Sequence, residues 1–414
     1  MAITNMTNFD AALKQIYSGD NLANTTLKRR PALAMLPKRN DFGGRNMPIV
    51  NIYGNPQGRS ASFSNALSNV SGVSVDDFLL TRVSNYSIAS VGGEVAEASR
   101  GDAMAFLQAM KASIDGAMNS LSNSVEAQLF RSGTGSIGTV GAYVGGASTF
   151  TLGEEEDVAN FEVNMVLVAS ATDGSALRSG SVTVTGVNRS TGVITGAVAW
   201  DGGSGITSFA PGDVVYPQGD AANGGTNVCL SGFSAWLPTS TPAGTFFGVT
   251  RSTDSRLYGQ YYDGSAGTVA QALITAQSLS NRVGGAPDVA FCNHVQYRAL
   301  LIDLYGNQNF NQVNATTHKG VVADISFRSV QIQGDSGPID VIAAARCPAE
   351  SAFVLEMDTW SLATLGDPVK ILNLDGQRIL RSSSADSYEC RIGFRGNLGC
   401  KAPIYNVNVA MPAV

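Results

Sequence analysis

Apolar side chains are most regularly spaced between residues 102 and 131. They recur there about every 3.6 residues, from Met104 to Leu129, which is the period of an α-helix. Residues 99–102 have the form of a helix N-cap, and Gly133 is typical of the position just after a helix end. The pattern predicts a helix over 102–131, about 45 Å long at about 1.5 Å per residue. Its other face carries mainly Ser and Asn, which favours a helix that protein covers on several sides.

Two β-type runs precede this helix, at residues 47–53 and 78–83, and a connection rich in Ser, Asn and Gly separates them. This arrangement predicts a long hairpin over residues 41–82. The connection holds too few large apolar residues to bury a core of its own. We therefore expect it to be disordered or to lie on a neighbouring molecule. Residues 1–40 are loosely patterned and polar, and they are predicted to form an arm.

The pattern becomes β-like between residues 149 and 223, where short Val- and Thr-rich runs alternate with Gly-rich turns. This texture predicts a small all-β barrel or sandwich inserted into the chain. The rest is mixed. Helices are expected from about residues 268 and 294, and strands near 326–332, 339–344, 353–356, 388–394 and 404–409. The fold class is therefore α+β.

Charge is sparse along these 414 residues, with 14% charged and 44% hydrophobic side chains. A typical soluble domain has roughly 25% charged residues, so much of this surface is expected to be covered by copies of the same chain. The net charge is −6, and the basic clusters are short, at residues 27–30 and 37–39. Tight nucleic-acid binding needs many clustered Lys and Arg, so only weak contact with DNA is expected.

The sequence predicts no metal site, no cofactor and no membrane span. Its five cysteines are widely spaced and it has two histidines, without the spacing of a zinc or redox motif. No run approaches the roughly 20 apolar residues that a span requires, and the first residues do not form a signal peptide. We expect a chain made in a reducing cytoplasm.

Two motifs suggest catalysis or cofactor binding but fit turns better. Residues 334–337 read Gly-Asp-Ser-Gly, as around the nucleophile of trypsin-like proteases, but neither His294 nor His318 has the context of that family's base. Residues 133–138 match GxGxxG, yet they follow a predicted helix instead of a strand. We expect a turn and a linker, and a protein that is not an enzyme.

The order of these elements resembles the major capsid proteins of tailed bacteriophages that share the HK97 fold. The most telling local similarities lie at residues 288–300, which look like that family's strand and helix in the axial (A) domain, and at residues 388–398, which look like the closing strand of its peripheral (P) domain. The resemblance implies an N-terminal arm, a hairpin called the E-loop, a spine helix, a P domain and an A domain. The β insertion is extra to this plan.

The resemblance implies these boundaries: arm 1–40, E-loop 41–82, P domain 83–148 with the spine helix at 102–131, inserted β domain 149–223, P-domain or connecting segment 224–264, A domain 265–382, and return to the P domain 383–414. It also implies a coat protein that assembles into hexamers and pentamers of an icosahedral head around double-stranded DNA. Assembly would take place in the host cytoplasm, and the protein would end in the virion capsid.

Candidate inter-subunit contacts are Arg59 and Phe63 in the E-loop and Arg29 and Arg30 in the arm. The chain lacks the long, charged, helical extension that some relatives use as a built-in scaffold, so a separate scaffolding protein is implied. The other implied partners are a portal and, as a further candidate, a decoration protein. Some relatives crosslink their shells through an E-loop Lys, but this chain has no Lys between Asp41 and Arg82. Two alternatives are an encapsulin-like compartment and a β-rich surface-layer or adhesin protein.

Overall fold

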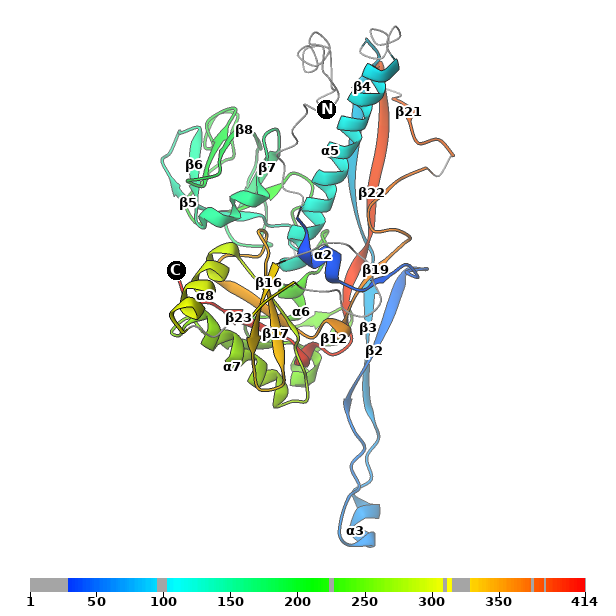
Figure 1. The fold of residues 1–414 in the computed structure, drawn as a ribbon. Helices are drawn as coiled ribbons and strands as arrows, with labels where there is room; N and C mark the ends of the chain where they lie inside the picture. The colour runs from blue at the N-terminus through cyan, green and yellow to red at the C-terminus, as the bar shows by residue number, and fades with distance from the viewer. Residues whose placement is uncertain are drawn as a thin grey trace.

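The computed structural model describes residues 29–94, 103–222, 227–307, 311–314, 328–373, 376–382 and 385–413. Its central body carries two projections in opposite directions (Figure 1). One is a thin β-hairpin, and the other is a long helix lying beside two long strands. A small barrel stands next to this helix. Most of the predicted arm and the predicted N-cap at 99–102 lie outside the described residues.

The long helix is α5 (Ala103–Phe130), which confirms the predicted spine helix. It lies on the antiparallel pair of β4 (Val83–Gly92) and β22 (Ser387–Cys400). Ala89, Val91 and Cys390 face the helix and pack against its Ile114 and Ala117. Four short strands complete this six-stranded sheet: β1 (Lys38–Arg39), β19 (Trp360–Thr364), β20 (Lys370–Ile371) and β21 (Leu380–Arg381).

The projecting hairpin consists of β2 (Asn46–Gly54) and β3 (Ser74–Thr81), as predicted for the E-loop region. Its connection contains a short helix, α3 (Phe63–Ser68), which the sequence did not predict. The base of the hairpin is held by a small two-stranded element, β11 (Thr245–Phe246) and β12 (Val249–Thr250). The backbone N–H of Leu79 donates to the Phe247 carbonyl at 2.8 Å. Phe78 meets Trp236 of α6 (Phe233–Trp236) edge to face, with 5.1 Å between ring centroids.

The inserted β domain is a closed barrel with strand order β10-β5-β6-β9-β8-β7 and its own apolar core. Its strands are β5 (Gly138–Tyr143), β6 (Thr149–Leu152), β7 (Val166–Ser170), β8 (Val182–Asn188), β9 (Val193–Gly196) and β10 (Val214–Pro217). The predicted start at residue 149 is wrong, because β5 pairs with both β6 and β10 and closes the barrel.

A seven-stranded sheet forms the rest of the body, in the order β13-β23-β18-β14-β17-β16-β15. These strands are β13 (Gln260–Asp263), β14 (Val289–Cys292), β15 (Asn311–Asn314), β16 (Arg328–Gln333), β17 (Pro338–Ala343), β18 (Ser351–Leu355) and β23 (Val407–Ala410). Helices α7 (Val269–Asn281) and α8 (His294–Asn307) pack on one face. The other face meets the end of α5, where Phe130 lies against Phe291 and Phe353.

This sheet corrects three predicted boundaries. Residues 383–414 do not return together to the first sheet, because β23 inserts between β13 and β18 of the second. Residues 265–382 are not one unit either, since β19, β20 and β21 pair in the first sheet. Within 224–264, β13 also belongs to the second sheet. The chain therefore crosses between the sheets more often than its linear order suggests.

The described end of the arm is fixed to the spine helix by α2 (Pro31–Met35). The Glu126 carboxylate of α5 accepts the backbone N–H groups of Ala32 at 3.0 Å and Leu33 at 2.8 Å. These two donors would have no partner inside such a short helix. Glu126 is only 1% exposed, and its burial raises the pKa to about 7 although these N–H groups and Arg346 and Arg30 oppose the shift.

Barrel closure by β5 gives a first prediction. A fragment of residues 134–222 should fold alone and melt cooperatively, because it contains all six strands and the apolar cluster that they enclose. A fragment of residues 149–222 should stay unfolded, since without β5 both β6 and β10 lose a partner. Circular dichroism during thermal melting distinguishes the two. Cooperative melting of the shorter fragment would show that β5 is dispensable.

Glu126 gives a second prediction. Its raised pKa means that the folded chain binds the proton more tightly, so the stability it contributes is full below about pH 4.5 and lost as the pH rises through about 7. The Glu126→Gln variant should not lose this stability as the pH rises. The difference in free energy of unfolding between variant and wild type should therefore change by about 3 kcal/mol at most between about pH 4.5 and about pH 7.

Urea unfolding between pH 5 and pH 8 measures this difference. Glu155→Gln, at an exposed position, is the matched control and should keep the wild-type profile. An identical pH profile for Glu126→Gln and wild type would contradict the assignment.

Candidate functional site

The hairpin has apolar side chains on both faces. Its inner face carries Met47, Ile49, Phe78 and Leu80, which are buried in the main core. Its outer face carries the cross-strand pairs Pro48–Leu79, Val50–Asp77 and Ile52–Val75. Four of these outer side chains are large, apolar and exposed, at 59% for Val50, 60% for Ile52, 44% for Val75 and 42% for Leu79.

The tip of the hairpin, residues 55–73, extends this apolar surface. Phe63 is 83% exposed, Leu67 66% and Val70 69%. Phe63 and Leu67 are four residues apart on α3 and therefore lie on one side of it. Ser71 closes the tip, since its N–H donates to the Gln57 carbonyl at 2.8 Å.

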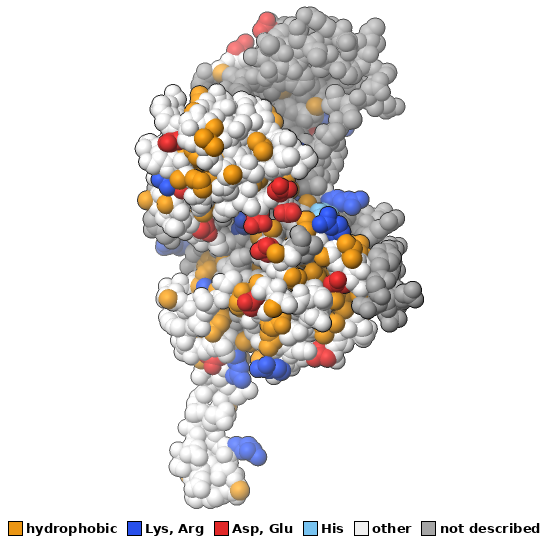
Figure 2. Space-filling model, turned by 90° about the vertical axis from the view of Figure 1, so that its left-hand side faces the viewer, with side chains coloured by type: hydrophobic (Ala, Val, Ile, Leu, Met, Phe, Trp, Pro, Cys, Tyr) orange, Lys and Arg blue, Asp and Glu red, His pale blue; other side chains and the backbone are white. Residues whose placement is uncertain are grey.

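The tip is far from the body (Figure 1) and is therefore not covered by the described part of its own chain. The hairpin is also nearly free of charged side chains on the face shown in Figure 2. Several large apolar side chains exposed on one projection are typical of a protein–protein contact. A two-stranded ribbon is marginally stable by itself, so a covering partner would also stabilise it.

Only two of the four predicted contact residues lie on this surface. Phe63 and Arg59 are both exposed at the tip. Arg30 instead contacts its own spine helix, where its guanidinium donates to Asn119 at 2.7 Å and to Asn123 at 3.0 Å. Arg29 is exposed. Burial of His294 at the start of α8 lowers the pKa of its imidazole, and the positive charge of Arg29 lowers that pKa further. The structure therefore does not bring the two arm arginines together with the hairpin.

The sequence did not indicate three contributors to this arrangement. Leu67 and Val70 are isolated apolar residues in a polar segment, and only their shared exposure at the tip distinguishes them. Glu126 occupies an interior position of a long helix, where a carboxylate ordinarily faces water. A Glu among apolar neighbours in the last third of the helix was the available signal for a buried role.

The two motifs considered for catalysis lie in connections. Residues 334–337 form the turn between β16 and β17, and the Asp335 carboxylate accepts hydrogen bonds from Ser278 and Asn281 of α7. Residues 133–138 link α5 to β5. No helix in the described ranges is long and apolar enough to cross a membrane. The same residues contain no group of three or more His, Cys, Asp or Glu side chains that could hold a metal.

All five cysteines are free and buried. Burial raises the pKa of Cys292 and Cys400 to about 12, and it also raises the pKa values of Cys229, Cys347 and Cys390. Thiols protonated in this way are poor nucleophiles and poor metal ligands. The most distinctive surface of the described chain is therefore the apolar hairpin.

Residues 214–377 match a family model described as SU10 major capsid protein. No curated protein sequence matches the chain. Among solved structures, the capsid asymmetric unit of cyanophage A-1(L) is similar, with 12% identity, coverage of 98% of this chain and 99% of that chain, and a TM-score of 0.55.

Two further structures are similar over nearly their whole length. A chain of Mycobacterium phage Bobi has 11% identity, full coverage of both chains and a TM-score of 0.43. The holo-SrpI encapsulin complex of Synechococcus elongatus PCC 7942 has 7% identity, coverage of 99% and 96%, and a TM-score of 0.48. The chain therefore shares its fold with the cyanophage capsid structure, and its residues 214–377 resemble the SU10 major capsid protein family.

Proposed function

We propose that this structural coat protein assembles into hexamers and pentamers of an icosahedral head that encloses double-stranded DNA. The outer face and tip of the hairpin carry the proposal, because they present large apolar side chains that their own chain leaves exposed. The surface needs a cover, and identical subunits in a shell supply one. Each hairpin would lie on an adjacent copy.

Shells of this kind form when one surface of a subunit meets a different surface of the next, and the rotation closes around symmetry axes. A hairpin suits such a contact because it reaches beyond the compact body. The nine residues of β2 alone span about 30 Å at about 3.3 Å per residue. Many modest contacts of this type then add across the lattice.

The remaining partners follow from the same role. We expect a separate scaffolding protein, a portal and a decoration protein as candidates, with assembly in the host cytoplasm. The net charge of −6 favours weak contact with packaged DNA, because strong phosphate binding needs a surplus of Lys and Arg. The chain is proposed to catalyse no reaction, since its thiols are buried and its protease-like motif is a turn.

An encapsulin-like compartment is the alternative within the same fold. Purified particles separate the two roles, because a phage head contains double-stranded DNA and a portal vertex, whereas a compartment contains cargo protein. Nuclease-protected DNA in particles purified from infected cells supports the head. Particles with protein cargo and no DNA would overturn it.

The tip gives a third prediction. Phe63→Ser with Leu67→Ser should leave the subunit folded, because both side chains are exposed in it. Each buried large apolar side chain contributes about 2 kcal/mol, so losing two should weaken the contact by about 4 kcal/mol, or nearly a thousandfold. Size-exclusion chromatography and electron microscopy should show free subunits at concentrations where wild type forms shells.

Val144→Ser is the matched control for this prediction. Val144 is 76% exposed on the barrel, so the change removes apolar surface without touching the hairpin. It should assemble as wild type does. Normal shells from the double variant would show that the tip is not an assembly contact.

The lack of an E-loop lysine gives a fourth prediction. Arg59, Arg45 and Arg82 cannot replace a nucleophilic amine, because arginine stays protonated at physiological pH. Mature particles boiled in detergent should therefore run as one band near 43.0 kDa. A ladder of linked oligomers would contradict this and would indicate Lys38 or Lys111 as the donor.

A further inference from the structure

A cavity of about 330 Å³ lies between the spine helix and the inserted barrel. One polar stripe of α5 lines it, with Asn119, Ser120, Asn123, Ser124 and Gln128 at helical spacing. This stripe belongs to the Ser- and Asn-rich face of α5, which the sequence predicts to be covered by protein. The structure instead places open space beside it.

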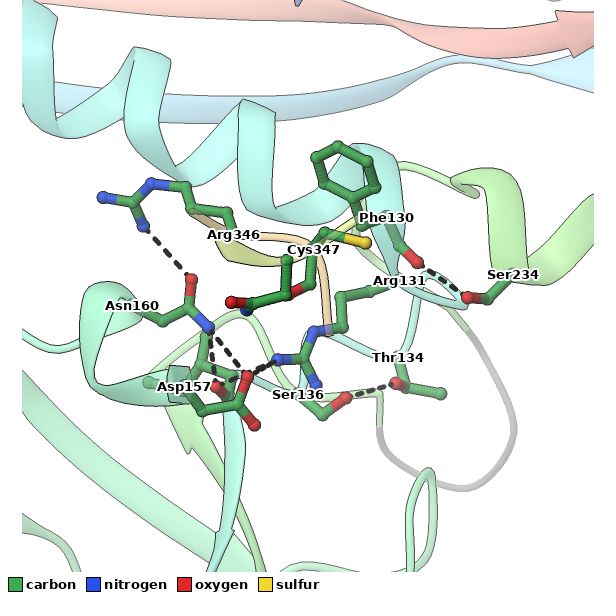
Figure 3. Close-up of polar contacts among 11 residues, drawn as sticks. Phe130, Arg131, Thr134, Ser136, Asp157, Asn160, Ser234, Arg346 and Cys347 are labelled. Carbon is green, nitrogen blue, oxygen red and sulfur yellow. Dashed lines mark hydrogen bonds and ion pairs between the residues drawn. The ribbon is translucent and has the colours of Figure 1, made fainter. Parts of the chain in front are cut away.

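A buried arginine reaches this cavity from the second sheet. Arg346 lies in the connection between β17 and β18 and is only 4% exposed. It extends along α5, and its Nη1 donates to the Asn160 side chain at 3.2 Å (Figure 3). Its Nε has no hydrogen-bond partner. Among the described residues, no ion pair of 4 Å or less involves Arg346.

Its neighbour Arg131 differs in this respect. Arg131 also lines the cavity, but it pairs with Asp157 at 2.5 Å, and Asp157 in turn accepts from Asn160 at 3.4 Å (Figure 3). The charge of Arg131 is therefore compensated. Arg346 has no such direct pair, and the carboxylates of Glu126 and Glu162 act on its charge from more than 4 Å away. A buried charge that lacks a direct partner is unfavourable, so an anion in contact with Arg346 would stabilise it.

Two amide groups add donors to the same wall. Arg30 donates to the side-chain oxygens of Asn119 and Asn123, and this fixes the orientation of both amides. Their Nδ2 groups, which are donors only, then make no hydrogen bond to another residue in the described ranges. The hydroxyl of Ser120 is exposed on the same stripe.

Two acidic groups near the cavity are engaged by other partners, and the third, Asp220, is the one acidic group among the described lining residues that is not. Glu162 lines it but pairs with Arg189 at 2.7 Å. Asp220 lines it too, and burial raises its pKa to about 6. Glu126 is close enough to interact with Arg346, but both of its carboxylate oxygens accept hydrogen bonds from backbone N–H groups of α2. The unsatisfied groups are thus mainly donors.

We propose that this cavity binds a small oxyanion, a phosphate or a carboxylate, through the Arg346 guanidinium and the amides of Asn119 and Asn123. Guanidinium groups bind both anions in a bidentate manner, and amide donors complete the shell. The anion would touch α5 and the loop of the second sheet beside the barrel. It would therefore link α5 to the loop of the second sheet.

Thermal melting of the full-length chain tests the proposal. Sodium phosphate and sodium acetate are each compared with sodium chloride at pH 7.5 and equal ionic strength. A ligand that binds only the folded state raises Tm in a saturable way, here by roughly 2–5 °C. A rise with phosphate alone, with acetate alone or with both supports the site and identifies its ligand. No rise above chloride would overturn it.

Asn119→Asp with Asn123→Asp is the decisive variant. Each Asp still accepts from Arg30, so the arm contact remains, but two donors are replaced by negative charge. The anion-dependent rise in Tm should disappear, because the new carboxylates repel the anion and take its place beside Arg346. Arg381→Gln is the matched control, since Arg381 is an exposed arginine paired with Asp386, and it should keep the rise.

Ser120→Asp provides a second variant if the double variant does not fold. Its side chain is exposed on the cavity wall, so folding should be unaffected and the rise should be reduced. A rise that persists in the Asp variants would show that the anion acts elsewhere on the protein.

Discussion

The hairpin of β2 and β3 has two apolar faces, and its own chain can cover only one of them. Met47, Ile49, Phe78 and Leu80 enter the main core, whereas Val50, Ile52, Val75 and Leu79 remain exposed. A strand that alternated apolar and polar residues would have been satisfied within the monomer. The described part of the subunit therefore leaves the second apolar face uncovered, and a contact with another copy, as proposed, would cover it.

The hairpin is continuous with the six-stranded sheet of the body, because β3 leads directly into β4. Strand β3 ends at Thr81, and β4 begins at Val83 and runs beside β22 under the spine helix. The Asn397 side chain of β22 donates to the Thr81 carbonyl at 2.8 Å and fixes this junction. Phe78 and Trp236 add an apolar anchor below it. A projection held in this way has a defined direction, as the proposed contact between subunits requires.

The sequence predicted those elements whose period is strong and local. The 3.6-residue repeat placed α5 to within a residue or so, and the turn signals placed the hairpin. Long-range pairing was not predictable, because nothing local in residues 407–410 indicates that they insert between β13 and β18. Strand β5 was missed because Gly138 and Gly141 resemble a linker. These glycines allow close contact, since a Cβ at Gly141 would lie 2.6 Å from the Leu152 carbonyl of β6.

Polar side chains make part of the contact between the inserted barrel and the rest of the subunit. The core of the barrel is separate from the main core, so apolar packing alone would let it slide over the spine helix. The contacts of Arg131 with Asp157 and of Arg346 with Asn160 are directional, and each is satisfied in only one orientation. Buried ion pairs often contribute little net stability, and we propose that here they favour one orientation of the barrel over others. An anion beside Arg346 would complete this network, and the orientation of the barrel would then depend on the solution around the subunit as well as on its sequence.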